Sequence, residues 1–296
     1  MSTKVALVTG AGGFTGRYLV PALRAEGYRV VAMGVGPVDG EDTLTCDLTD
    51  PAAVRAAVLR ACPTHVVHLA AVAFVGHGDP RSFYDVNVFG TLNLLEALGG
   101  LETPPRKVLV ASSANVYGTP GVEVIDESVC PGPVNHYACS KLAMEHMVRT
   151  WFDRLPIVVT RPFNYTGVGQ DTQFLIPKIV DHFKRRERVL NLGNLDVARD
   201  FSDVRDLVAA YVALLASNAA SGVFNVCSGR TVRLRDLLRR MSEHTGHDPE
   251  IRVDPDLVRK NEIPSLCGDN SKLARLTGCR CDTDLYSTVD WMLSAE

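Results

Sequence analysis

The sequence predicts an α/β protein built on a doubly wound parallel sheet, with a smaller and discontinuous C-terminal part. Short apolar runs alternate with longer segments of helical period, which is the pattern of βαβ units. A glycine-rich turn follows the first run, and the alternation loosens after about residue 166. The runs of strand length are Val5–Thr9, Arg29–Ala32, His65–Leu69, Val108–Ala111 and Ile157–Thr160, and helical segments such as Phe83–Leu98 and Tyr137–Phe152 separate them.

The alternation also predicts how the chain divides into domains. We expect residues 1–166 to form a dinucleotide-binding domain, to which residues 200–228 return because they again have a helix-then-strand pattern. Residues 167–296 are richer in proline and charge and are expected to bind substrate for the most part. Ligands of such a sheet bind at the C-terminal strand ends, where Gly10, Ser112 and Arg161 fall.

Composition excludes several classes of protein. The 296 residues are 46% hydrophobic and 22% charged, which is typical of a globular chain. A net charge of −3 gives no general attraction to nucleic acid or to an anionic membrane. Neither a secretory leader nor an apolar run of about 18 residues is present, so we expect a soluble, cytoplasmic protein. The eight cysteines are scattered and predict reduced thiols, with no metal site.

A glycine-rich loop immediately follows the first predicted strand and opens a helix. Its spacing is GxxGxxG through Gly10, Gly13 and Gly16, because Thr15 stands where GxGxxG would have its third glycine. Glycines at such a turn let the backbone approach a pyrophosphate, which then faces the unpaired N–H groups of a helix N-terminus. In this context the loop predicts a Rossmann-type dinucleotide site rather than a merely structural turn.

The cofactor itself is less sharply predicted. The second strand runs into Met33-Gly34-Val35-Gly36, which offers no carboxylate for the ribose 2′-hydroxyl of NAD. No cation follows that strand directly either, although Arg17 could approach a 2′-phosphate from the first helix. We therefore favour NADP(H) slightly and leave NAD(H) open.

An acid/base pair is predicted on one later helix. Tyr137 and Lys141 are four residues apart and share a helix face. A nearby ammonium stabilises a phenolate, which lets the phenol exchange protons near neutral pH. Ser112 and Ser113 end the fourth strand and could hydrogen-bond the same reacting oxygen. An isolated YxxxK pattern indicates only a solvated lysine beside a tyrosine, so the prediction depends on the glycine loop and on SSANVYG at 112–118.

Several motifs together resemble one family over almost the whole chain. Besides the loop and YACSK these are Asp47-Leu48, HLAA at 68–71, Asn87 in DVNVFGTLNLLEA, SSANVYG, RPFN at 161–164 and RDFSDVRD at 199–206. The sequence is similar to the extended short-chain dehydrogenases/reductases that act on nucleotide sugars. The resemblance implies catalysis by Ser113, Tyr137 and Lys141. It also implies cofactor contacts from Gly10, Gly13, Phe14, Thr15, Gly16, Asp47, Leu48, Leu69, Ala70, Ala71, Tyr137 and Lys141.

The resemblance also narrows the substrate and the reaction. The segment from Leu192 to Asp196, running into RDF, resembles enzymes of GDP-mannose metabolism, both dehydratases and reductases. Family dehydratases have a glutamate just after the catalytic hydroxyl, whereas this chain has Ala114 and Asn115, neither of which can act as an acid or base. We therefore expect a reductase that transfers hydride to the C4 keto group of a GDP-4-keto-6-deoxy sugar, giving a GDP-deoxysugar such as GDP-rhamnose.

Two other functions remain open from the sequence. A nucleotide-sugar 4-epimerase with tightly bound NAD would use the same three catalytic residues. A cofactor-binding regulatory protein without turnover is a third possibility, against which the intact triad argues. By resemblance, Asn164, Arg199 and Arg259 are expected to contact the substrate, the two arginines at its diphosphate. A homodimer is also implied by the resemblance.

Overall fold

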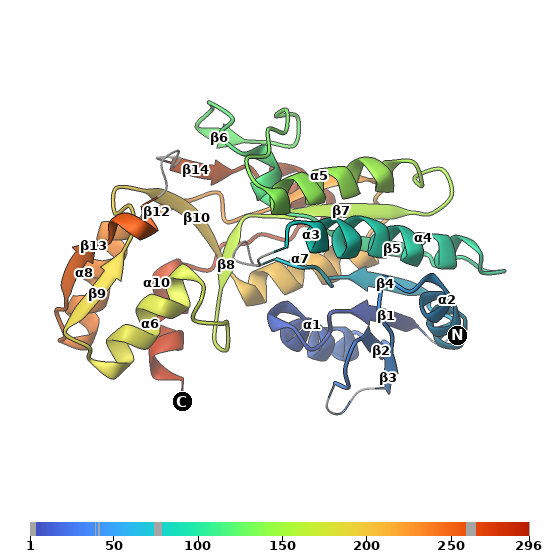
Figure 1. Ribbon diagram of the computed structural model, residues 1–296, viewed down its shortest axis with the longest axis horizontal. Helices are drawn as coiled ribbons and strands as arrows, with labels where there is room; N and C mark the ends of the chain where they lie inside the picture. The colour runs from blue at the N-terminus through green and yellow to red at the C-terminus, as the bar shows by residue number, and fades with distance from the viewer. Residues whose placement is uncertain (1–3, 39, 41, 74–78, 259–264, 296) are drawn as a thin grey trace.

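The computed structural model describes residues 4–38, 40, 42–73, 79–258 and 265–295. Its largest element is a seven-stranded parallel sheet in the order β11-β7-β5-β4-β1-β2-β3 (Figure 1). The order doubles back at β1, which is the doubly wound arrangement that the sequence predicted. The strands are β1 (Val5–Thr9), β2 (Arg29–Gly34), β3 (Asp42–Thr45), β4 (His65–His68), β5 (Lys107–Ala111), β7 (Ile157–Pro162) and β11 (Gly222–Val226).

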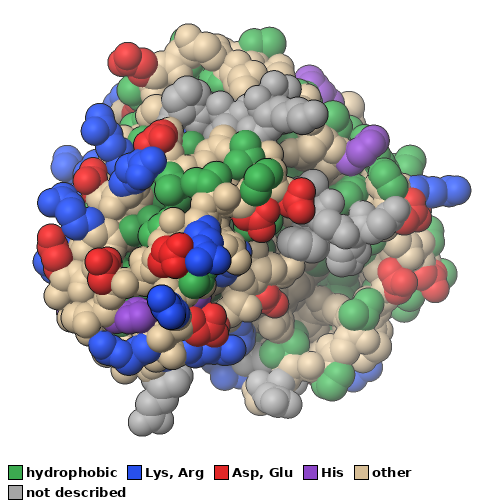
Figure 2. Space-filling view, turned by 60° about the vertical axis from the view of Figure 1, so that its left-hand side comes forward, with side chains coloured by type: hydrophobic (Ala, Val, Ile, Leu, Met, Phe, Trp, Pro, Cys, Tyr) green, Lys and Arg blue, Asp and Glu red, His purple; other side chains and the backbone are tan. Residues whose placement is uncertain are grey.

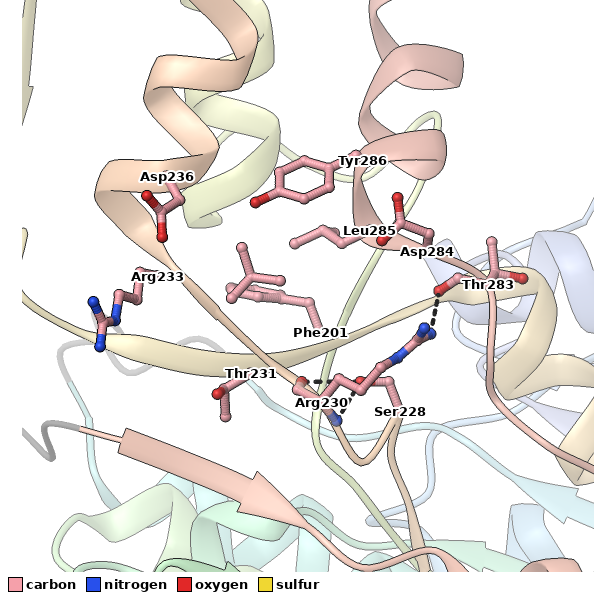
Figure 3. A pocket seen from close by; sticks show the side chains of 11 residues that line it. Phe201, Ser228, Arg230, Thr231, Arg233, Asp236, Thr283, Asp284, Leu285 and Tyr286 are labelled. Atoms are coloured by element: carbon pink, nitrogen blue, oxygen red, sulfur yellow. Dashed lines mark hydrogen bonds between the residues drawn. The ribbon is translucent and has the colours of Figure 1, made fainter.

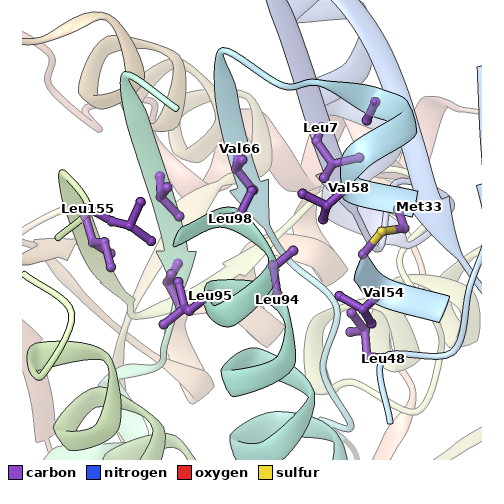
Figure 4. Close-up of a cluster of buried hydrophobic side chains, with 14 of the residues drawn as sticks. Leu7, Met33, Leu48, Val54, Val58, Val66, Leu94, Leu95, Leu98 and Leu155 are labelled. Atoms are coloured by element: carbon purple, nitrogen blue, oxygen red, sulfur yellow. The ribbon is translucent and has the colours of Figure 1, made fainter. Parts of the chain in front are cut away.

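Helices cover both faces of this sheet, because its strands carry apolar side chains on each side. One core lies between the sheet and α2, α4 and α5, and includes Leu7, Val58, Val66 and Leu94 (Figure 4). The other core lies beneath α1 and α7, and α9 also contributes to it through Leu273. The helices are α1 (Phe14–Ala25), α2 (Pro51–Ala61), α4 (Thr91–Gly99), α5 (His136–Arg149), α7 (Val204–Ala216) and α9 (Ser271–Thr277).

A smaller region lies beside the C-terminal ends of the large sheet, at the left of Figure 1. Its apolar core is formed by side chains of α6, α8, α10 and the strands next to them. The second sheet has the order β12-β10-β14-β6, with β8 also paired to β10, and β9 pairs with β13. The elements are β6 (Val124–Ile125), β8 (Asn164–Thr166), α6 (Leu175–Arg185), β9 (Val189–Leu192), β10 (Ala198–Asp203), β12 (Thr231–Arg233), α8 (Leu234–Thr245), β13 (Glu250–Val253), η3 (Pro255–Leu257), β14 (Ser265–Gly268) and α10 (Leu285–Ser294).

Two local features differ from the sequence prediction. The four-residue edge strand β3 was not expected, and Asp47 therefore follows β3 rather than the second strand. The helix predicted over 83–98 is divided into α3 (Arg81–Tyr84), a π-helical turn η1 (Asp85–Gly90) and α4. A π-helical turn inserts an extra residue into the helix and often marks a functional site. Here the turn contains Asn87, which is fully buried.

None of the helices in the described ranges has the length and apolar character of a membrane span. Figure 2 shows basic and acidic side chains intermixed over one face of the molecule, consistent with the net charge of −3.

Candidate active site

The glycine loop has the tight geometry that a dinucleotide site requires. Gly10 has a φ of +69°, and a Cβ added there would lie 2.8 Å from the backbone nitrogen of Ala70. A Cβ on Gly16 would lie only 2.2 Å from the carbonyl oxygen of Ala11. Helix α1 begins directly after Gly13, which provides no side-chain cap. The first N–H groups of α1 are therefore left for a ligand, and a diphosphate fits such a helix N-terminus.

Thr15 and Phe14 attach the loop to the neighbouring strand β8. The Thr15 Oγ1 atom lies 2.9 Å from the Tyr165 hydroxyl oxygen, at hydrogen-bonding distance. The rings of Phe14 and Tyr165 stack with their centroids 6.0 Å apart. Thr15, which stands in place of the third glycine of GxGxxG, is therefore paired with Tyr165. The pairing of Thr15 with Tyr165 could not be read from the sequence.

Arg17, which could have approached a 2′-phosphate of the cofactor, has a different partner in the structure. Its guanidinium donates to the carbonyl oxygen of Gly169 at 2.5 Å, so it is directed to the loop before α6 and not to the end of β2. The next residue, Tyr18, likewise donates to the carbonyl oxygen of Val168 at 2.6 Å. The first turn of α1 is thus held against residues 168–169.

The other predicted cofactor residues border the same edge of the sheet. Ala70 donates its N–H to Thr9 Oγ1 at 3.1 Å, which places the 69–71 segment against Gly10. Leu69 and Ala71 are partly buried on either side. Asp47 is exposed, and its carboxylate accepts hydrogen bonds from the backbone and hydroxyl of Thr49 at 2.9 and 2.8 Å. Leu48 is buried in the core and is expected to contact a cofactor through its backbone only.

A buried hydrogen-bonded chain connects this loop with the helix that carries Tyr137. His68 Nδ1 lies 2.7 Å from Thr9 Oγ1, and His68 Nε2 lies 2.8 Å from Thr91 Oγ1. Thr91 in turn donates to the carbonyl oxygen of Asn87 at 2.7 Å. Burial lowers the pKa of His68 to about 3, so the ring is neutral at ordinary pH. His68 therefore links Thr9 and Thr91 by hydrogen bonds and carries no charge.

Asn87 completes the connection from inside the π-helical turn. Its amide group accepts from the Val72 N–H at 2.9 Å and donates to the Val72 carbonyl oxygen at 3.1 Å. It also donates to Ser140 Oγ at 3.0 Å, and Ser140 donates to the carbonyl oxygen of Tyr137 at 2.8 Å. Asn87 therefore fixes the start of α5 relative to the loop that follows β4.

Tyr137 lies in the first turn of α5, where Asn135 caps the helix by accepting from the N–H of Ala138. Burial raises the pKa of Tyr137 to about 12, and hydrogen bonding by the Ser113 hydroxyl opposes that rise. From the sequence, the Lys141 ammonium was expected to lower this pKa. Burial is instead the dominant influence, so Tyr137 is a protonated phenol that can donate to a reacting oxygen.

Lys141 is one turn further along the same helix face and is buried. Its Nζ donates to the carbonyl oxygen of Ala111, at the end of β5, at 2.8 Å. Burial lowers the pKa of Lys141 to about 8, while Glu145 raises it. The ammonium therefore titrates near the pH at which the protein would act.

Ser113 and Ser112 have different roles in the structure. Ser113 is buried, and its Oγ accepts from the Asn115 N–H at 3.2 Å as it caps the short helix η2 (Ala114–Tyr117). Ser112, in contrast, donates to the Glu145 carboxylate at 2.6 Å. The expectation that both hydroxyls reach the reacting oxygen is therefore wrong for Ser112, because its hydroxyl is held by a buried acid.

Two of the predicted substrate residues, Asn164 and Arg199, lie on the paired strands β8 and β10. Asn164, in β8, is exposed and donates to the carbonyl oxygen of Asp200 at 3.2 Å. Arg199, in β10, donates to the carbonyl oxygen of Ala198 at 2.8 Å. The contact expected of Arg259 lies outside the described residues. Ala114 is buried and Asn115 is exposed, so no carboxylate follows Ser113 in η2.

A pocket in the smaller region is not lined by these residues. It lies between β10, β12, α8 and α10, where Phe201, Leu285 and Tyr286 face one another (Figure 3). Arg230 at its margin donates to the carbonyl oxygens of Asp282 and Thr283 at 2.7 and 3.2 Å. None of the predicted catalytic residues lines it. The residues predicted to form the active site lie elsewhere, after β1 (Gly10), after β5 (Ser113) and in the first turn of α5 (Tyr137). The described residues contain no cluster of metal ligands.

Comparison with known proteins gives consistent matches over the chain. Residues 6–227 match the model of the NAD dependent epimerase/dehydratase family. The chain is 37% identical to GDP-6-deoxy-D-talose 4-dehydrogenase of Aggregatibacter actinomycetemcomitans, over 92% of this chain and 90% of that protein. It is 32% identical to GDP-6-deoxy-D-mannose reductase of Pseudomonas aeruginosa, over 99% of this chain and 97% of that protein.

Solved structures share the whole architecture. A protein of Burkholderia cenocepacia, described as a candidate epimerase, is 48% identical with a TM-score of 0.92, covering 99% of this chain and 97% of that one. The structure of RMD from Pseudomonas aeruginosa, complexed with NADPH, is 31% identical with a TM-score of 0.86 over 99% of this chain and 97% of that one.

Proposed function

The chain belongs to the NAD dependent epimerase/dehydratase family, the extended short-chain dehydrogenases/reductases, and is therefore an NAD(P)-dependent oxidoreductase; on that premise we propose that it reduces a GDP-4-keto-6-deoxy sugar at C4. The product would be a GDP-6-deoxyhexose. The observation that carries the proposal is the grouping of Ser113, Tyr137 and Lys141 without a carboxylate in the η2 segment that follows Ser113.

The glycine loop and the three catalytic residues would each have a separate role in such a reduction. The N-terminus of α1 and the glycine loop would hold the diphosphate of the dinucleotide, whose nicotinamide supplies the hydride when bound. Ser113 would orient the C4 carbonyl by hydrogen bonding to its oxygen. Tyr137 would donate its proton to that oxygen as negative charge develops. Lys141, charged below a pH of about 8, would stabilise the phenolate that remains.

The same residues argue against a dehydration. Elimination of water needs an acid or base beside the catalytic hydroxyl in addition to the tyrosine. Ala114 has no titratable group, and the Asn115 amide neither gives up nor accepts a proton in that role. A preformed ketone needs only one hydride and one proton, which this site can provide.

The substrate and cofactor preferences rest on similarity together with local geometry. Two relatives named for GDP-linked 6-deoxy sugars support a GDP sugar. The NADPH bound by the Pseudomonas aeruginosa protein supports NADP(H), as does the neutral Gly34–Val38 segment after β2. We accordingly propose NADPH as the reductant. The homodimer stays a prediction that light scattering can test.

A nucleotide-sugar 4-epimerase is the second candidate, favoured by the 48% identity to the Burkholderia cenocepacia candidate epimerase. Such an enzyme would return the hydride to the opposite face of C4 and keep its cofactor. Incubating the protein with NADPH and GDP-4-keto-6-deoxymannose separates the two. Reduction consumes one NADPH for each keto sugar converted. A 4-epimerase would leave NADPH unoxidised with this ketone, and would instead interconvert GDP-6-deoxyhexoses that differ at C4 without net change at 340 nm.

A further inference from the structure

Glu145 is a fully buried acid on the helix face that carries the catalytic pair. It lies one turn beyond Lys141 and two turns beyond Tyr137, so all three share one side of α5. Its side chain and that of Arg161 are each only 1% exposed. Arg161 donates two hydrogen bonds to the Glu145 carboxylate, from Nε at 2.9 Å and from an Nη at 2.6 Å.

The carboxylate also joins the strand ends that form the active site. Ser112 donates to it from the end of β5, next to Ser113. Arg161 reaches it from β7, and its guanidinium stacks over the ring of Tyr117 at 4.7 Å. Lys141 meets the end of β5 as well, through the carbonyl oxygen of Ala111. One acidic group therefore connects α5, β5 and β7.

A buried ion pair by itself gives little net stability, because desolvating two charges offsets their attraction. The charge of Glu145 has a further consequence, since it faces a buried ammonium one helical turn away. The other titratable groups around this pair are Tyr137 on the same helix, His68 from β4, Arg161 from β7 and Tyr117 in η2. His68 is neutral, so Glu145 is the negative charge that offsets the burial of Lys141.

We propose that Glu145 is a positioning residue for catalysis, which orients α5 against the ends of β5 and β7 and places a negative charge one helical turn from the Lys141 ammonium. This inference rests on the proposed function only in assigning Lys141 to the chemistry. The Glu145 carboxylate is 1% exposed and accepts from Ser112 and Arg161, so it acts from behind the site rather than at its surface. Its effect is transmitted through Lys141, whose pKa it raises, and through Ser112, which precedes Ser113 in the chain.

The test compares variants that alter the charge with variants that keep it. Glu145→Gln removes the charge, and we expect the alkaline midpoint of kcat, near pH 8 in the native protein, to fall by about one pH unit. Ser112→Ala removes a neutral hydrogen bond from the same carboxylate and should leave that midpoint in place. Glu145→Asp keeps a carboxylate and should retain the midpoint even where kcat decreases.

Glu145→Gln leaves Arg161 buried without its partner, which can prevent folding. The double variant Glu145→Gln/Arg161→Gln removes both charges. Because loss of the Arg161 cation acts on Lys141 in the opposite direction, its midpoint is compared with that of Arg161→Gln and should lie at lower pH. A midpoint in Glu145→Gln equal to that of Ser112→Ala, or a midpoint in the double variant equal to that of Arg161→Gln, would overturn the proposal, because a purely structural role changes the rate without moving the titration.

A second readout separates this inference from the proposed function. In protein labelled with 13C at the lysine ε-carbon, the Lys141 signal is assigned by its loss in Lys141→Arg, and its chemical shift is followed against pH without any substrate. We expect the titration of Lys141 to move to lower pH in Glu145→Gln by about the same one unit. An absence of turnover on every keto sugar would count against the proposed function alone. An unmoved Lys141 titration would count against the role of Glu145.

Discussion

Replacing Gly16 by alanine should damage the cofactor site through a backbone collision. The added Cβ would lie 2.2 Å from the Ala11 carbonyl oxygen and 2.5 Å from the carbonyl carbon, where ordinary van der Waals contact begins at 3.4 Å. The loop and the first turn of α1 must therefore separate by about 1 Å. Such overpacking costs about 1–3 kcal/mol, which corresponds to a rise of about 5- to 160-fold in the Kd for NADPH if the whole cost falls on the cofactor-bound conformation.

Gly12→Ala is the matched control within the same loop. Its Cβ would meet only the Val38 Cγ2 atom, at an ordinary 3.5 Å, and Gly12 does not have a positive φ. Fluorescence titration with NADPH gives the two Kd values, and thermal unfolding shows whether each variant is folded. If Gly16→Ala binds NADPH as tightly as Gly12→Ala, the close approach of α1 to the loop at Ala11 does not shape the cofactor site and the reasoning is refuted.

Three further predictions follow from the catalytic and buried residues. Tyr137→Phe should lower kcat by about 100-fold or more, because the proton donor is lost, while NADPH binding in a titration remains close to that of the native protein. Ser113→Ala should lower kcat by about 100-fold at saturating substrate; an unchanged kcat would contradict its carbonyl-orienting role. Native stability should fall as pH decreases below about 6.5, by about 1.4 kcal/mol per pH unit from His68 alone, because its pKa is about 3 when folded and 6.5 when unfolded and the unfolded state binds the extra proton. Urea unfolding at pH 5.5 and 7.5 should therefore show a smaller pH difference in His68→Gln, and an equal difference in both proteins would exclude this linkage.

The large sheet was predictable because its strands are short apolar runs separated by helical segments, a pattern set by local burial. The strand β3 was not predictable in the same way, since Asp42–Thr45 has only one buried side chain. The π-helical turn was also missed, because helical periodicity does not distinguish an inserted residue from a regular turn. Its reason lies in tertiary contacts, through which Asn87 reaches Val72 and Ser140.

The candidate site was predictable where it depends on spacing along one element. Glycines around one turn and a phenol four residues before a lysine are visible in the sequence. The partners that come from distant strands were not visible, among them Tyr165 for Thr15 and Arg161 for Glu145. Glu145 did leave one signal: it is an acid eight residues after Tyr137, on the face of α5 that also carries Lys141.

The most direct test of the proposed activity is the stoichiometry of the reaction with GDP-4-keto-6-deoxymannose. The protein is incubated with the sugar and NADPH, absorbance at 340 nm is followed, and the GDP-sugars are separated by chromatography. Our account predicts one NADPH oxidised for each GDP-6-deoxyhexose formed, with Tyr137→Phe nearly inactive. No oxidation of NADPH with the keto sugar, together with interconversion of GDP-6-deoxyhexoses that differ at C4 at constant absorbance, would contradict it.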